Sequence, residues 1–255
     1  NIKGVKVDFM DRDDQYMVDF YHRLAVECAK RKIFIIYHGS YKPDGMTRTY
    51  PNMLTFEGVL GNEYSKWTNQ PVPVHNVTIP FTRMITGPMD FTPGSMVNTT
   101  KDAFAADMMK PMTMGTRAQQ LAMLVVYESG IQSLCESPKL YEALPEFEFY
   151  RQAPASWDST IVLSGKISEY IVIARKKGDT WFLGAMTNWD RRELQADLSF
   201  LGEGRWNAEI YADGPNADTV PSEVTISRRE VSGSESLGLS LAKGGGCGII
   251  FRRKN

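Results

Sequence analysis

The beginning of the chain alternates between short apolar runs and one long amphipathic stretch. Residues 4–10 alternate between apolar and polar side chains, which indicates a strand. Residues 13–32 place apolar side chains at helical spacing, with acidic residues near the start and basic residues at the end, as the helix dipole favours. Residues 33–39 form a continuous apolar run, typical of a strand that is buried on both faces. This order of strand, helix and strand predicts a βαβ unit with parallel strands.

The next segments are less regular but extend the same alternation. They predict strands at 53–59, 87–91 and 131–135, long loops at 64–86 and 96–115, and helices at 116–129 and 137–151. A closed barrel needs eight strand–helix units, whereas the five strand ends expected here would also suit an open sheet. No glycine-rich phosphate loop supports an open nucleotide-binding sheet. We therefore favour an α/β fold in which about five βα units form the C-terminal part of a (β/α)8 TIM barrel.

The pattern changes after residue 153. Short alternating strands, separated by Gly, Asp and Asn, continue to the end of the chain, and segments 169–175 and 180–186 predict a hairpin. Several strands at this spacing are typical of an antiparallel β-sandwich. We expect two domains, with the barrel portion at 1–153 and the all-β antiparallel sandwich domain at 154–255.

Composition narrows the possible partners. The formal net charge of −1 gives no reason to expect a nucleic acid or an anionic membrane as partner. No run of 18 apolar residues predicts a membrane span. Neither the three cysteines nor the three histidines have the spacing of a zinc site, so we interpret the cysteines as buried thiols. The chain begins without Met in what looks like a strand, which suggests a fragment of a longer protein.

Carboxylates mark the strand ends. Asp8, Glu57 and Asp90 each end a predicted strand, and Glu63 lies just beyond one. One face of a barrel would gather all four. Paired carboxylates in a cleft are usual for glycoside cleavage and are also common ligands of Ca²⁺ or Mg²⁺. For Asp8 two other interpretations stay open: it caps the following helix, or it pairs with Lys6 on the same strand face.

Several motifs in a fixed order resemble glycoside hydrolase family 97. They are KVDFMDRDDQ at 6–15, YHG at 37–39, RTYPN at 48–52, FEGVLGNE at 56–63, DFTPG at 90–94 and TRAQQLA at 116–122. The resemblance continues through the predicted sandwich and covers essentially the whole chain. It implies an exo-acting α-glycosidase with an N-terminal β-sandwich, a central (β/α)8 barrel and a C-terminal β-domain. This chain would then begin at the fourth barrel strand, its partner would be the missing N-terminal part of the same enzyme, and its location would be a bacterial periplasm or cell surface.

The resemblance also implies a reaction type. Retaining members have a nucleophilic Asp at the end of the fourth barrel strand, where this sequence has Asp8. Inverting members place a base Glu at the end of the fifth strand, where this sequence has Gly39. Both positions resemble the retaining branch, which acts on α-galactosides. Glu63 falls on the family's general acid/base, and Glu57 and Glu63 fall on glutamates that bind calcium.

The implied mechanism gives the remaining polar residues possible roles. Asp8 would attack the anomeric carbon while Glu63 protonates the leaving oxygen, with the two carboxyl groups about 5–5.5 Å apart. Lys6 would favour the ionised nucleophile and could bond a sugar hydroxyl. We expect His38 and Asp90 to face the substrate. Two further questions stay open, since Trp67 could stack on the sugar or pack its loop, and a bound calcium would lower the pKa that a general acid needs raised.

Two alternatives to an α-galactosidase remain at this stage. One is a related α-glycosidase with another sugar, such as an α-glucoside or a substrate like a β-L-arabinopyranoside. The other is an inactive barrel that carries a carbohydrate-binding β-domain, against which the presence of both Asp8 and Glu63 argues.

Overall fold

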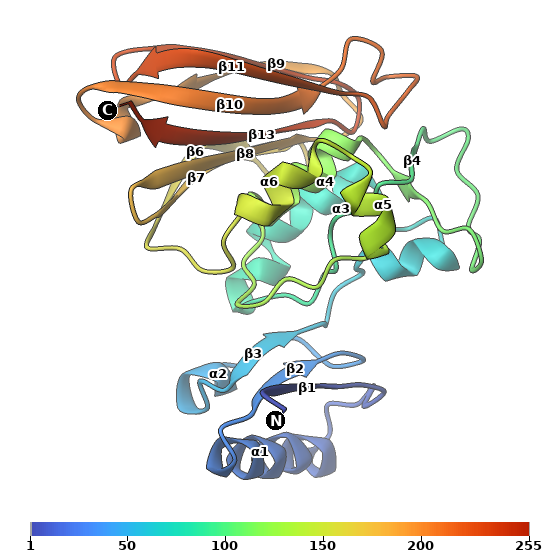
Figure 1. Ribbon diagram of the computed structural model, residues 1–255. Helices are drawn as coiled ribbons and strands as arrows, with labels where there is room; N and C mark the ends of the chain where they lie inside the picture. Colours follow the sequence, from blue (N-terminus) through green and yellow to red (C-terminus); the bar gives the residue numbers. More distant parts are fainter. Residues whose placement is uncertain (1, 255) are drawn as a thin grey trace.

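The computed structural model describes residues 2–254, and an α/β unit lies at its N-terminal end (Figure 1). Its elements are β1 (Gly4–Val7), α1 (Gln15–Lys30), β2 (Phe34–Tyr37), α2 (Met46–Thr49) and β3 (Met53–Phe56). The three strands pair in parallel in the order β1-β2-β3. The predicted βαβ unit is therefore confirmed.

Helix α1 begins and packs as its sequence suggests. The Asp14 side chain accepts a hydrogen bond from the Met17 backbone N–H, which satisfies one of the free donors of the first turn. The apolar face of α1 buries Tyr21, and the Tyr21 ring meets that of Tyr37 on β2 edge to face, with the ring centroids 4.6 Å apart. These contacts give the α/β unit a small core of its own.

The central region holds short helices and two minimal strands. They are η1 (Asn62–Lys66), α3 (Pro73–Thr78), η2 (Ile79–Phe81), η3 (Arg83–Thr86), β4 (Asn98–Thr99), β5 (Thr113–Met114), α4 (Arg117–Val126), α5 (Pro138–Glu142) and α6 (Phe147–Gln152).

Three sequence predictions were wrong or only partly right in this region. Segment 87–91 contributes one isolated parallel bridge, between Met89 and Phe56, and segment 131–135 is not a strand. The predicted helix over 137–151 is split into α5 and α6, because Pro145 between them lacks an N–H and disfavours helical geometry at the residue before it. Within residues 2–254 the parallel strands do not close, so the (β/α)8 barrel stays a prediction.

Helix α4 joins the central region to the β-domain. The Thr116 hydroxyl accepts from the Gln119 backbone N–H, as the capping pattern predicts. Almost every residue of α4 is buried, because the helix lies directly on β8 and β13. A Cβ at Gly184 would stand 2.8 Å from the Ala122 carbonyl oxygen, so only glycine permits this approach.

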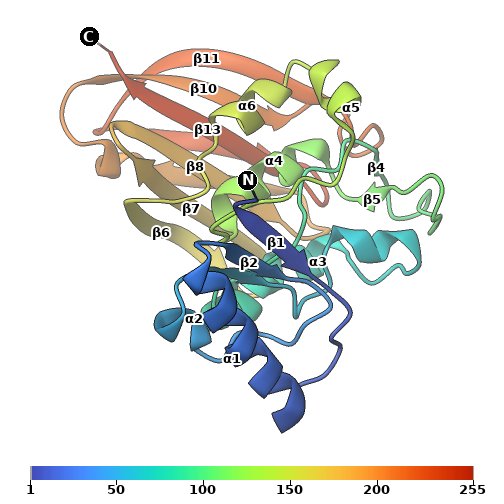
Figure 2. The ribbon, with the colours of Figure 1, turned by 60° about the horizontal axis from the view of Figure 1, so that its bottom comes forward.

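The C-terminal region is an antiparallel β-domain, as predicted (Figures 1 and 2). Its strands are β6 (Ser159–Lys166), β7 (Tyr170–Lys177), β8 (Thr180–Thr187), β9 (Arg192–Asp197), β10 (Arg205–Asp213), β11 (Val224–Ser232), β12 (Ser236–Leu241) and β13 (Gly246–Arg253), with η4 (Ser199–Leu201) between β9 and β10. Six strands form one sheet in the order β11-β10-β13-β8-β7-β6, and β12 pairs with β9. The predicted hairpin is β7–β8, with Lys177 opposite Thr180. The main core of the domain lies between the two sheets.

Three smaller predictions can be compared with these elements. The domain boundary after residue 153 stays a prediction. The two parts are in contact, because the ring of Phe149 in the first part packs against that of Tyr211 in the second. Cys28 and Cys247 are buried thiols, but Cys135 is exposed, so that part of the prediction was wrong. Among the described helices, none combines the length and the apolar character that a membrane crossing requires.

Candidate active site

The predicted site residues lie at the C-terminal edge of the parallel sheet. The strand register places Val7 beside Tyr37, and Tyr37 beside Phe56. The residues that follow these three, Asp8, His38 and Glu57, therefore emerge together at one edge. Asp90 joins them because Met89 bridges to Phe56.

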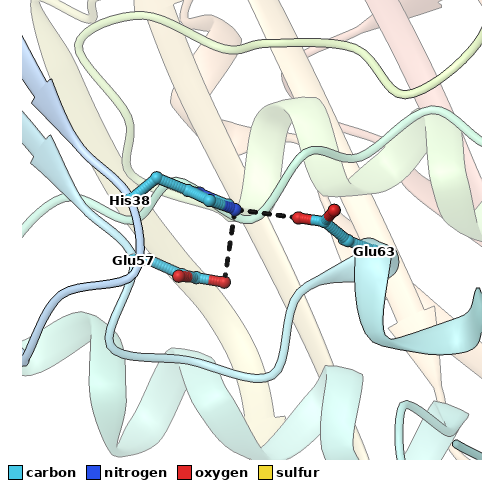
Figure 3. A group of neighbouring side chains, drawn as sticks. All are labelled: His38, Glu57 and Glu63. Atoms are coloured by element: carbon cyan, nitrogen blue, oxygen red, sulfur yellow. Dashed lines mark hydrogen bonds and ion pairs between the residues drawn. The ribbon is translucent and has the colours of Figure 1, made fainter. Parts of the chain in front are cut away.

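His38 stands at the centre of this group (Figure 3). Its Nδ1 lies 2.8 Å from Asp90 Oδ2, and its Nε2 lies 2.8 Å from Glu63 Oε2 and 3.5 Å from Glu57 Oε1. Lys6 Nζ lies 2.8 Å from the same Asp90 oxygen. Of the four carboxylates that the sequence predicts to gather at one face, Glu57, Glu63 and Asp90 lie together here, and His38 connects them.

The charge of His38 follows from its partners. An imidazole can donate from both nitrogens only when it is protonated, and both of its partners here are carboxylates. The hydrogen bond to Asp90 raises the pKa of His38 to about 9, against the opposing effect of burial, and Glu63 adds to the increase. Burial is the largest single influence on the pKa of Asp90 and of Glu63 and acts to raise both. The positive groups beside them, His38 with Lys6 at Asp90 and His38 with Lys66 at Glu63, together outweigh burial, so both pKa values lie below the usual range.

Glu57 differs from the other carboxylates. Its side chain is buried, and burial raises its pKa. Its Oε2 accepts a 2.6 Å hydrogen bond from the Gly39 backbone N–H, which holds the side chain against the end of β2. The backbone of Glu57 is held as well, by a residue that sequence reasoning missed.

That residue is Arg83, a buried arginine. Its guanidinium donates to the backbone carbonyls of five residues, which are Phe56, Glu57, Gly58, Gly87 and Pro88. These carbonyls belong to the end of β3 and to the segment before Asp90, so Arg83 joins the two strand ends that present Glu57 and Asp90. A lone arginine in a proline-rich loop carries no periodic signal that could have pointed to this position.

Asp8 occupies the exposed end of β1. The two other interpretations of Asp8 were wrong. Asp14, not Asp8, caps α1, and Lys6 pairs with Asp90 instead of Asp8. Its Oδ1 accepts from the Phe9 backbone N–H at 2.6 Å. A Cβ at Gly39, whose φ is +52°, would stand only 2.6 Å from that oxygen. The Asp8 carboxylate therefore rests against a position where a side chain cannot fit.

The backbone that follows Asp8 is strained. Phe9 has φ 62° and Asp11 has φ 45°, both in a region that residues other than glycine seldom adopt. The Asp11 N–H donates to the Gly39 carbonyl at 2.7 Å, which fastens this turn to the end of β2. Local strain of this kind is common where a reactive side chain must be held in place.

Trp67 lies apart from the cluster. Its side chain is half exposed, and its ring packs at a tilt against Tyr64, with the centroids 5.3 Å apart. Its predicted contact with a sugar stays a prediction.

Three of these residues could contribute to a cation site. Ligand atoms of His38, Glu57 and Glu63 lie within 4.8 Å of one another. Carboxylate oxygens are the ligands that Ca²⁺ prefers, whereas imidazole nitrogen is not. The two glutamates thus fit as part of a calcium site. His38 would have to give up its proton when such a cation binds beside it, because like charges repel.

Two family models match this chain. One, for "Glycoside hydrolase 97", matches residues 1–59, and the other, for "Glycosyl-hydrolase 97 C-terminal, oligomerisation", matches residues 156–252. Together they cover more than half of the chain. The chain belongs to glycoside hydrolase family 97. The family motifs at residues 6–15 and 56–63 begin at the ends of strands β1 and β3, which agrees with this membership.

Named relatives and solved structures of family 97 align over nearly the whole chain. It is 45% identical over 254 residues to a "Retaining alpha-galactosidase" of Bacteroides thetaiotaomicron, a match that covers 98% of this chain and 38% of the relative. It is 35% identical over 250 residues to a "Probable retaining alpha-galactosidase" of Streptomyces bingchenggensis, covering 98% and 36%. A family 97 enzyme from Pseudoalteromonas sp. strain K8, solved with acarbose, superposes with a TM-score of 0.86 at 38% identity, covering 95% of this chain and 38% of that one. The chain therefore spans well under half the length of these relatives.

Proposed function

We propose that this chain supplies the catalytic residues of a retaining exo-α-glycosidase that hydrolyses terminal α-galactosides. The observation that carries the proposal is the pairing of Asp8 with Gly39: the carboxylate rests where a side chain at position 39 would collide with it. A base at position 39 and a nucleophile at position 8 thus exclude each other in this backbone. The names of the two curated relatives support the same reaction and sugar.

The reaction would proceed in two steps. Asp8 attacks the anomeric carbon, a bond forms between its carboxylate and the sugar, and the bond to the leaving oxygen breaks as Glu63 protonates that oxygen. Water then attacks the intermediate, with Glu63 as base, and releases the sugar with its original anomeric configuration. Glu63 needs a proton for the first step, and His38 Nε2 holds one 2.8 Å from Glu63 Oε2. Transfer along this hydrogen bond would leave a neutral imidazole and an acid ready to act.

We further propose that Glu57 and Glu63 hold Ca²⁺. The ion takes six to eight oxygen ligands, and two carboxylates provide at most four, so substrate, water or other protein groups would complete the site. When bound, the ion would act as a Lewis acid and orient the sugar. Chelation of calcium should then lower activity, and unchanged activity after chelation would remove this role.

We also propose the fold of the complete enzyme, its substrate contacts and its location. The parallel sheet would belong to a (β/α)8 barrel whose other strands lie elsewhere in the polypeptide, followed by the β-domain from about residue 154. Lys6, Asp90 and Trp67 would contact substrate, and the enzyme would work in a bacterial periplasm or at the cell surface.

The configuration of the first product tests this function. Proton NMR of the complete enzyme acting on an aryl α-galactoside should show α-galactose first, followed by mutarotation to the β-anomer. An initial β-product would show inversion and refute the retaining mechanism. If the enzyme hydrolysed α-glucosides or β-L-arabinopyranosides faster than α-galactosides, the proposed substrate would change but the proposed mechanism would not.

A further inference from the structure

Gln120 on α4 binds the segment that carries the proposed acid. Its side chain is buried, and its Oε1 accepts a 2.8 Å hydrogen bond from Asn62 Nδ2. The same oxygen accepts from the backbone N–H groups of Gly94 at 2.9 Å and of Ser95 at 3.2 Å. One buried amide oxygen thus joins α4 to the start of η1 and to the segment that follows Asp90.

The start of η1 depends on contacts outside the helix. Glu63, which η1 carries in its first turn, directly follows Asn62 (Figure 3). The Asn62 backbone N–H donates to the Phe91 carbonyl at 3.0 Å, so both the main chain and the side chain of Asn62 are held. A Cβ at Gly61 would stand 2.7 Å from the same Phe91 oxygen, so the chain enters η1 in close contact with that segment. A five-residue 3₁₀-helix has few internal hydrogen bonds of its own, and these outside contacts therefore decide where it lies.

We propose that Gln120 is a positioning residue that sets where the Glu63 carboxyl group stands when it protonates the leaving oxygen. This inference rests on the proposed function. A general acid must lie within hydrogen-bond reach of the atom that it protonates, and a displacement of about 1 Å can cost about 100-fold in rate. His38 and Lys66 contact the Glu63 carboxylate itself, whereas Gln120 fixes the backbone from which that side chain extends.

The neighbouring residue, Gln119, fixes α4 to the β-domain. Its Nε2 donates to the Thr187 carbonyl at 2.8 Å and to the Gly245 carbonyl at 3.3 Å, at the ends of β8 and β13. Its Oε1 accepts from Asn76 Nδ2 at 3.0 Å. None of these partners lies on η1. Because α4 is held in this way, Gln120 connects η1 to a rigid support.

The test compares two aryl α-galactosides on the complete enzyme. Phenolate is a poor leaving group that needs a proton, whereas dinitrophenolate leaves without one, so only the phenyl substrate depends on the acid. Gln120→Met removes the acceptor oxygen at nearly the same side-chain volume. We expect Q120M to lower kcat/KM by about tenfold for the phenyl substrate and by less than about twofold for the dinitrophenyl substrate, because a displaced acid loses part of its contribution of about 100-fold or more.

Two further variants separate positioning from a general loss of structure. Gln119→Met is the matched control, because it removes buried hydrogen bonds from the same helix without touching η1. It should leave the ratio of the two kcat/KM values as in the wild type. Asn62→Leu removes the donor at the other end of the bond and should lower this ratio as Q120M does, so the test does not depend on the folding of one variant.

The ratio is independent of the amount of folded enzyme, since both substrates are measured on the same sample. An unchanged ratio in folded Q120M or N62L, or an equal change in Q119M, would overturn the role of Gln120. Glu63→Ala distinguishes this failure from failure of the proposed function, because it should lower the ratio by about 100-fold or more. An unchanged ratio in E63A would show that Glu63 is not the acid, which would refute the proposed function and the role of Gln120 with it.

Discussion

Substitution of Gly39 by Ala should impair catalysis far more than it impairs folding. The new Cβ would meet Asp8 Oδ1 at 2.6 Å and the Phe9 backbone nitrogen at 2.6 Å, so the proposed nucleophile and its turn must shift. A displacement of about 1 Å in a reacting group can cost about 100-fold in rate. We therefore expect kcat on an aryl α-galactoside to fall by about 100-fold.

The backbone cost of this substitution can be measured separately. Gly39 has φ +52°, and an L-residue there loses about 1–2 kcal/mol. Gly178, in the β7–β8 turn, has φ +55°, and no atom lies within 4 Å of the position that a Cβ would take there, so Gly178→Ala carries the same backbone cost without a collision. Chemical denaturation should show a loss of about 1–2 kcal/mol in both variants, with an extra loss of similar size in G39A from the forced shift.

Steady-state kinetics then separates the two effects. G178A should retain the kcat of the wild type, because its strain lies in a hairpin of the β-domain. If G39A and G178A had the same kcat within about twofold, the contact between position 39 and Asp8 would not affect catalysis. The proposal that a side chain at position 39 and a nucleophile at position 8 exclude each other would then be refuted.

Two further predictions follow from the contacts of His38 and Arg83. Because the pKa of His38 is raised to about 9, its charged form stabilises the calcium-free fold below pH 6.5, and this stabilisation, up to about 3 kcal/mol, should be lost as the pH rises toward 9. Asp90→Asn removes the main cause, so unfolding curves of that variant should depend less on pH over this range, and an unchanged dependence would contradict the assignment. Arg83→Met removes the hydrogen bonds to five carbonyls, of which those of Phe56 and Pro88 still accept from a backbone N–H, and should cost about 3–5 kcal/mol in unfolding free energy. The exposed Arg151→Met should change it by less than about 0.5 kcal/mol, and similar losses in both variants would show that Arg83 does not join the strand ends.

The convergence of Asp8, His38 and Glu57 could be predicted because it depends on strand direction alone. Apolar runs that end at Asp8, His38 and Glu57 imply parallel strands, and the carboxyl ends of parallel strands meet at one edge. The hairpin β7–β8 was equally readable, since alternating apolar positions and a Gly-containing turn specify it locally.

The partners within the site could not be predicted, because they depend on loops that pack across long sequence separations. Lys6 could have paired with Asp8, two residues away, yet it pairs with Asp90. The two carboxylates that His38 connects lie 25 and 52 positions away from it in the chain. Segment 131–135 has the apolar residues of a short strand but gains no partner strand, and such a segment has no reason to stay extended.

The most direct test of the central claim removes the Asp8 carboxylate and supplies another nucleophile. The complete enzyme carrying Asp8→Gly should be nearly inactive on an aryl α-galactoside, because no covalent intermediate can form. Added azide should restore turnover by attacking the anomeric carbon from the side that Asp8 occupied, and NMR should identify β-galactosyl azide. A D8G variant that stays folded but gains no activity and forms no β-azide would show that Asp8 is not the nucleophile.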